Sequence, residues 1–206
     1  MAMPGIDPRT QTDVIDTLAG IKRGSALDAI RNRRPDARDQ AQASYRALFA
    51  PEISGEVTAT ERFAVAAFVT GLHGDAETAS FYAAGLAASG ASAELRRAID
   101  TAIAAAKGQG PYGSYPAGPL SPEDTTGPNH RVAAETRGAL GLRLAAALDH
   151  AHLLVLHPRD AAPAALQALL DAGWSTTDIV TLSQIAAFLS FQIRVVAGLR
   201  VLAGPA

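Results

Sequence analysis

The chain has 206 residues, of which 48% are hydrophobic, and its formal net charge is −2. This length is enough for one sizeable core. The near-neutral charge gives no electrostatic basis for binding nucleic acid or an anionic membrane. The sequence contains no cysteine, so a disulfide, a thiolate nucleophile and a cysteine-bound metal are all excluded.

Residues 1–55 predict an N-terminal helical extension. Short helices are expected over residues 13–21, between Ser25 and Pro35, and over residues 36–49. Ser25 is a good N-cap, and a proline cannot continue the helix that precedes it. The basic run at residues 31–34 is interpreted as a solvated helix end rather than a phosphate site.

Neither a signal peptide nor a membrane span is expected. Residues 1–16 lack a basic stretch leading into an apolar one. The most apolar segment, residues 185–202, is interrupted by Gln192, Arg194 and Arg200. We therefore predict a cytoplasmic protein with no membrane partner.

A first helical unit is predicted over residues 56–107, and it begins with a capping box. Thr58 and Glu61 have the spacing at which a hydroxyl and a carboxylate each satisfy a free backbone N–H. The helix that follows is expected to end at His73 and Gly74. Two further helices complete the unit.

The second helix of this unit is expected to begin after Asp75 and to end at Gly90, a residue suited to the left-handed conformation. Ser92 is placed to cap a third helix over residues 93–107. Residues 108–129 are dense in Gly and Pro and show neither helical nor strand periodicity. This segment is too long for a routine connection, so it is either a solvated linker or a functional lid.

Residues 130–206 predict a second helical unit. A helix is expected over residues 131–156, a short one ends at Gly173, and a long one runs to about residue 202. Gly90 and Ser92 correspond to Gly173 and Ser175 at an offset of 83 residues. The pattern indicates a duplicated three-helix unit in one compact all-α domain, with no convincing strand.

The segment over residues 58–90 resembles the carboxymuconolactone decarboxylase/alkylhydroperoxidase D superfamily. Its peroxidase branch carries a helix with an Arg/Glu pair, followed by Cys-x-x-Cys-x-x-x-His on the next helix. Aligned on the glycine at the helix end, the family's histidine position falls on Tyr82 and its cysteine positions fall on Asp75 and Thr78. The family's proton-relay glutamate falls near Glu61.

The last helix, with the sequence TLSQIAAFLSFQIRVVAGL, also looks like a cysteine-less subgroup of these proteins. The resemblance implies an alkylhydroperoxidase D-like helical fold, a homo-oligomer and chemistry without a cofactor. Thiol-peroxidase chemistry is excluded, because Asp, Thr and Tyr cannot cycle through sulfenate and disulfide states.

Three side chains are candidate proton-handling groups: Glu61, His73 and Tyr82. Each also has a structural interpretation. Glu61 completes the capping box, His73 is a cation favoured at a helix C-terminus, and Tyr82 is a core residue with one hydrogen bond.

Arg194 stands on the last helix in a narrow strip of small residues that includes Ser183, Ala187 and Ser190. The helix is apolar nearly all round, which suggests burial by other subunits as well as by its own core. Arg194 is interpreted as an intersubunit ion-pair partner, with a substrate-carboxylate clamp or solvent exposure as alternatives. Gln184 and Gln192 are candidates for the same contacts.

A metal site is not expected at His150, His152 and His157. The first two face different sides of a helix, and His150 and His157 are about 10 Å apart along its axis.

Two functions follow as hypotheses. The first is acid/base chemistry on a small carboxylate, with Glu61, His73 and Tyr82 handling protons and Arg194 anchoring the substrate. The second is a catalytically degenerate homologue that serves as a structural or ligand-binding partner of a cysteine-bearing relative.

Overall fold

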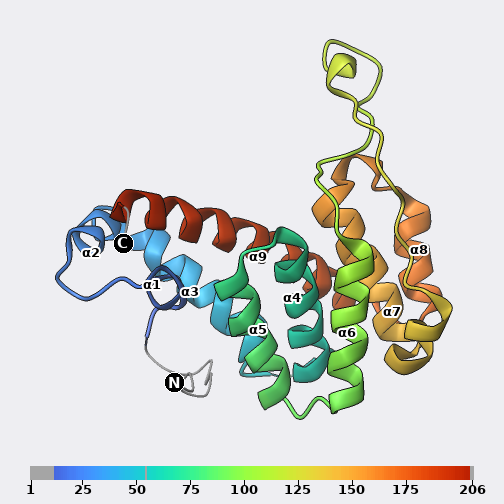
Figure 1. The fold of residues 1–206 in the computed structure, drawn as a ribbon, viewed down its shortest axis with the longest axis horizontal. Coiled ribbons are helices and arrows are strands. Elements are labelled where there is room, and N and C mark those ends of the chain that lie inside the picture. The colour runs from blue at the N-terminus through green and yellow to red at the C-terminus, as the bar shows by residue number, and fades with distance from the viewer. Residues whose placement is uncertain (1–11, 54, 205–206) are drawn as a thin grey trace.

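The computed structural model describes residues 12–53 and 55–204, and this part of the chain is all-helical, as predicted. It contains nine α-helices and two short 3-10 helices, η1 (Ser121–Glu123) and η2 (Pro158–Asp160), and no strand. Figure 1 shows an elongated body with a narrow projection at one end.

The N-terminal extension consists of α1 (Val14–Ala19), α2 (Ala26–Arg31) and α3 (Pro35–Phe49), close to the expected bounds. These helices pack along the C-terminal part of the last helix (Figure 1). Buried apolar side chains such as Ile15, Leu18 and Tyr45 join these helices to the core, and ion pairs add to this packing. Arg31 bonds the carboxylates of Asp13 and Asp16. The interpretation of the whole basic run as solvated is therefore wrong for Arg31, whose side chain is 8% exposed.

The centre of the molecule is α4 (Ala59–His73), which is packed between α5 (Ala76–Ala88), α6 (Ala93–Ala106) and two later helices. A Cβ added at Gly85 would lie 2.3 Å from Cε1 of Phe63. Glycine at this position lets α5 approach α4 closely, which is how the core closes on this side.

The second half contains α7 (Ala134–Leu156), α8 (Pro163–Asp171) and α9 (Thr176–Ala203). Gly141, with φ 77°, kinks α7 near its start. Gly90 and Gly173 both adopt positive φ, at 88° and 89°, and Ser92 and Ser175 both cap the next helix. The corresponding helices differ in length, however, at 15, 13 and 14 residues against 23, 9 and 28.

Residues 108–129, called the arm below, leave the body as a long loop that folds back on itself (Figure 1). The backbone N–H of Tyr112 donates to the carbonyl of Leu156 over 2.6 Å, which fixes the arm at the end of α7. Farther out, the guanidinium of Arg159 lies 4.1 Å from the ring centre of Tyr115. The arm is thus anchored to α7 and the residues that follow it.

Two described helices, α7 and α9, are long and apolar enough to cross a membrane by length and composition alone. Half of the most apolar window of α7, and 39% of that of α9, is buried inside the protein. Core helices of folded domains pass the same test, so this is weak evidence for a span.

Candidate functional site

The N-terminal end of α4 holds a closed polar cluster around Glu61. Its carboxylate accepts from the backbone N–H of Thr58 over 2.8 Å, which completes the predicted capping box. It also accepts from Nε of Arg143 over 2.8 Å. Nη2 of Arg143 also donates to the carboxylate of Asp178 over 3.4 Å, and the guanidinium carbon lies 3.7 Å from the ring centre of Trp174. Glu61 is therefore tied into a structural network.

The positions where the resembled family keeps its cysteines and histidine lie on α5. Asp75 caps this helix by accepting from the N–H of Thr78 over 2.8 Å, and it pairs with Arg200 over 2.6 Å. Thr78 and Tyr82 are fully buried. The hydroxyl of Tyr82 donates to Oε1 of Gln192 over 2.7 Å.

Tyr82 lies among aromatic rings rather than beside an open site. Its ring centre is 5.2 Å from those of Phe49 and Phe81. Burial raises the pKa of the phenol well above its ordinary value, and the hydrogen bond to Gln192 offsets this only in part. The core interpretation of Tyr82 fits this environment.

A groove of about 680 Å³ opens at the other end of α4, beside His73. Its walls come from the ends of α4 and α7, from the base of the arm and from the middle of α9. Most of the lining is apolar: Leu72, Pro111, Leu154, Val155, Leu156 and Ala186. This volume lies within the range of small-molecule sites, which combine apolar walls with few polar groups.

The polar groups of the groove come mainly from one line along α9. Ser183, Ala187, Ser190 and Arg194 follow each other at helical spacing and all line the groove. The strip of small residues seen in the sequence is thus a wall of the cavity. Arg194 is exposed, and its guanidinium donates to the carbonyl of Ser190 over 2.9 Å.

His73 and Ser190 form a polar pair inside the groove, with 3.1 Å between Nε2 and Oγ. Burial lowers the pKa of His73, and the positive charge of Arg194 lowers it further. The imidazole is therefore neutral at pH 7 and can accept a proton. Arg194 supplies the fixed positive charge beside it.

A second pair, His150 with Ser183, lies on the α7 side, with 3.3 Å between Nε2 and Oγ. The Ser183 hydroxyl donates to the carbonyl of Ile179 over 2.8 Å. The N–H at Nε2 of His150 is therefore the donor to Oγ of Ser183. Burial lowers the pKa of His150 and keeps it neutral. Its Nδ1 is buried without a hydrogen-bond partner in the structure.

The structure does not bring the predicted catalytic residues together. Glu61 and His73 stand near opposite ends of α4, about 18 Å apart along its axis. Tyr82, on α5, is buried against Phe49 of α3, Phe63 of α4 and Gln192 of α9. Of the three, His73 alone lines the groove, and Arg194 joins it there. Gln184 is exposed and Gln192 is buried, so these two also occupy different environments.

Three histidine rings lie close together at the base of the arm. The ring of His152 lies 4.9 Å from that of His130 and 5.8 Å from that of His157. Nε2 of His157 lies 2.9 Å from the carbonyl oxygen of Pro128, and its Nδ1 lies 3.0 Å from the carboxylate of Asp160. In the described part of the chain, no group of three or more His, Asp or Glu residues is placed to hold a metal ion.

The fold and the groove define an all-helical protein with an open cavity that carries one histidine and one arginine. No family model, curated protein or solved structure matches the chain. The resemblance of residues 58–90 to the carboxymuconolactone decarboxylase/alkylhydroperoxidase D superfamily therefore stays a prediction.

Sequence reasoning missed two components of this region. The sequence pattern marks Ser183 and Ser190 as small residues and indicates no role for their hydroxyls. Residues 108–111, at the base of the arm, line the groove although they are remote in sequence from its other walls. For the two serine hydroxyls, the available signal was the strip of small residues, because it contains serines and an arginine.

Proposed function

We propose that the groove binds a small carboxylate-bearing molecule, with Arg194 as its anchor and His73, paired with Ser190, as the group that exchanges a proton with it. The observation that supports this is the placement of His73 and Arg194 in one cavity of about 680 Å³ with mainly apolar walls. An arginine fork matches a carboxylate, and a neutral imidazole beside it is a suitable general base.

The proposal keeps the acid/base chemistry expected from the sequence and changes its residues. His73 and Arg194 remain, whereas Glu61 and Tyr82 serve the fold. We also propose that the chain is a cysteine-free relative of the carboxymuconolactone decarboxylase/alkylhydroperoxidase D superfamily. The matched glycines and serine caps at Gly90, Gly173, Ser92 and Ser175 support a duplicated helical unit.

Binding can be tested with benzoate and its neutral isostere benzamide, by isothermal titration and by the NMR shifts of the histidine rings. We expect benzoate to bind and benzamide to bind at least about tenfold more weakly. Arg194→Gln should remove this preference. Arg33→Gln, at an exposed arginine elsewhere, is the matched control and should leave it unchanged. Benzoate binding that Arg194→Gln does not alter would contradict the proposal.

Proton transfer can be tested with pyruvate in D₂O, by following deuterium entry at the methyl carbon by NMR. His73 takes a proton from that carbon, the electron pair moves into the enolate, and the exchanged imidazole returns a deuteron. His73→Gln should abolish protein-dependent exchange, and Glu61→Gln should retain it. If benzoate binds but no exchange occurs, the groove serves for binding alone, as in the hypothesis of a ligand-binding partner.

A further inference from the structure

One face of α9 is exposed over most of the helix and is mainly apolar, with Gln184 and Arg194 as its polar residues. Its exposed residues are Val180, Gln184, Ala187, Phe191, Arg194, Gly198, Val201 and Leu202. They fall within about 100° of the helix circumference and span about 33 Å of its length. Four of the ten exposed large hydrophobic side chains in the described structure lie on this face, among them Phe191 at 47% exposure. We call it the α9 stripe.

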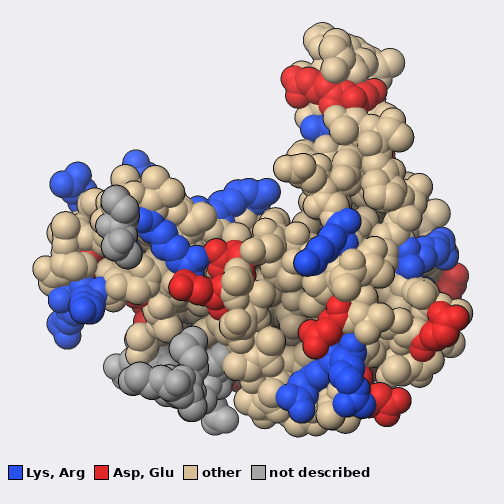
Figure 2. Space-filling model, viewed as in Figure 1, with Lys and Arg blue, Asp and Glu red and all other residues tan. Residues whose placement is uncertain are grey.

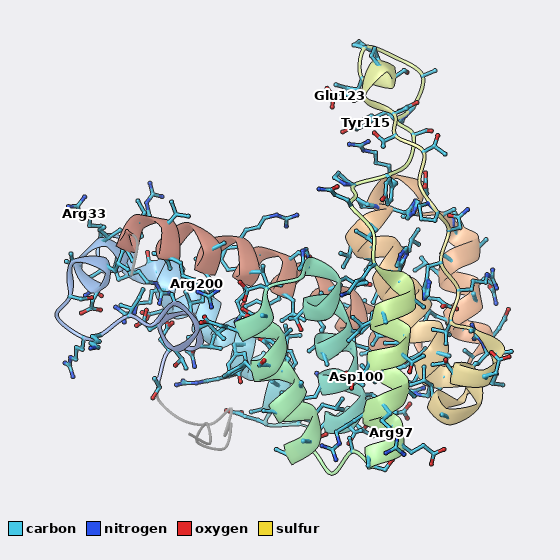
Figure 3. The ribbon with its side chains drawn as sticks, viewed as in Figure 1. Arg33, Arg97, Asp100, Tyr115, Glu123 and Arg200 are labelled. Atoms are coloured by element: carbon cyan, nitrogen blue, oxygen red, sulfur yellow. The ribbon has the colours of Figure 1, made fainter. Side chains whose placement is uncertain are left out.

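The α9 stripe lies between two parts of the molecule with opposite charge. Figure 1 shows α9 along the upper edge of the body, with the arm rising near one end and α2 at the other. The arm carries Glu123 and Asp124 and no Lys or Arg. Residues 22–34, around α2, carry five Lys or Arg and one Asp. Figures 2 and 3 show the acidic band on the arm, with Glu123, and the basic patch at the far end, with Arg33.

We propose that the α9 stripe is the contact surface of a symmetric dimer, in which two α9 helices pack antiparallel and the arm of each copy reaches the basic end of the other. Antiparallel packing follows from charge. It places the acidic arm against Arg33 and Arg34 of the second copy, whereas a parallel arrangement would place the two acidic arms side by side. In the antiparallel register Phe191 lies near the two-fold axis and faces its counterpart.

The size of the surface explains why the arm is part of this contact. A stripe about 33 Å long and about 10 Å wide presents roughly 330 Å², well below the roughly 800 Å² per partner of a stable interface. Two arms, each laid on the opposite copy, add the missing area. Small residues on the stripe, such as Ala187 and Gly198, allow close approach of the two helices. Ala187 and Arg194 belong both to the α9 stripe and to the lining of the groove, so the dimer would also cover part of the opening of the groove. Phe191, Glu123 and Arg33, which are changed in the tests below, do not line the groove.

The first test is the oligomeric state, measured by sedimentation velocity and light scattering at micromolar concentration. We expect a dimer, and Phe191→Asp should weaken it at least about 30-fold, because a central aromatic contact is replaced by a charge. Leu142→Asp is the matched control, because Leu142 is 70% exposed and lies on α7, and it should leave the dimer intact. Circular dichroism and the melting temperature verify that both variants are folded.

The second test is a charge exchange between the arm and the basic end. Glu123→Lys and Arg33→Glu should each weaken the dimer about fivefold, because each change acts twice in a symmetric pair. The double variant should recover most of this loss. Additive losses without recovery would overturn the antiparallel arrangement.

The third test uses the absence of cysteine. Phe191→Cys should be cross-linked to a second copy by a short bis-maleimide, and Leu142→Cys should not. A monomer at all concentrations, a dimer that is indifferent to Phe191→Asp, or a monomer that binds lipid vesicles through α9 would each refute the proposal.

Discussion

The two ends of α4 differ in how they use polar side chains. At the N-terminal end, the carboxylate of Glu61 is bonded to Thr58 and Arg143, and Arg143 has further partners. At the C-terminal end, His73 is paired with Ser190 and faces an open groove beside the exposed Arg194. Polar groups whose hydrogen bonds are all made within the protein stabilise the fold, whereas polar groups that face a groove are available to a ligand. Changes at the closed end should therefore lower stability, and changes at the open end should alter binding.

The largest expected effect is acid destabilisation at the cluster of His130, His152 and His157. Burial, together with the neighbouring His130 and His157, lowers the pKa of His152 to about 4. In the unfolded chain the pKa is 6.5. The contribution of His152 is therefore fully present above pH 6.5 and falls as the pH drops toward 4, by up to about 3 kcal/mol. Urea unfolding followed across this pH range measures the loss.

His152→Phe provides the control for this effect. The variant keeps a ring in the stack and cannot take up a proton, so its stability should depend much less on pH between about 7 and 4. Loss of the His152 contact with the backbone of Ala106 will lower its stability at neutral pH. If the pH dependence is the same as in the unaltered protein, His152 is not its source.

The second effect is loss of stability at the closed end. Arg143→Met removes the charged partner of Glu61 and Asp178 and keeps an apolar stem against Trp174. We expect the free energy of unfolding to fall by about 2 kcal/mol, because two partly buried carboxylates lose a charge-assisted hydrogen bond. Benzoate binding should be unchanged. A large change in affinity with little loss of stability would contradict the assignment of this end to the fold.

Much of the fold follows from local sequence signals. The serine and threonine caps, the two capping boxes and the glycines after helices set the helix bounds to within a few residues. These signals are local, because each is completed within four or five residues of chain. The sequence does not distinguish a linker from a lid in the arm, because the residue that anchors the arm, Leu156, is distant in sequence.

The site could be predicted only in part. The sequence indicates His73 and Arg194 separately, the first at a helix end and the second in a strip of small residues. Their shared cavity depends on how α4 crosses α9, which no local signal specifies. The family resemblance suggests Glu61 and Tyr82 as site residues, whereas their actual interactions, with Arg143 and Gln192, join residues more than 80 positions apart.

A smaller stability effect is expected at Tyr82, in the closed core. Tyr82→Phe removes the hydroxyl that donates to Gln192, whose buried Nε2 has no partner in the structure. The free energy of unfolding should fall by about 1 kcal/mol, because a buried amide loses its hydrogen bond. Combining this change with Gln192→Leu should restore much of the loss, since both polar groups are then absent. Pyruvate exchange should be unaffected if the core interpretation of Tyr82 is right.

The smallest effect concerns the pH dependence of binding at the open end. The pKa of His73 is lowered in the free protein by burial and by Arg194, and a bound carboxylate would raise it by adding a negative charge nearby. Binding is then linked to proton uptake, so benzoate should bind more tightly as the pH falls through the His73 range. The gain expected from one ion pair in a solvated groove is about fivefold. Titration calorimetry in two buffers of different ionisation enthalpy measures the number of protons taken up on binding.

His73→Gln is the control. In this variant the affinity should no longer vary with pH and no proton should be taken up, while the preference for benzoate over benzamide, which depends on Arg194, remains. Proton uptake that survives this substitution would place the titrating group elsewhere and would separate His73 from the ligand.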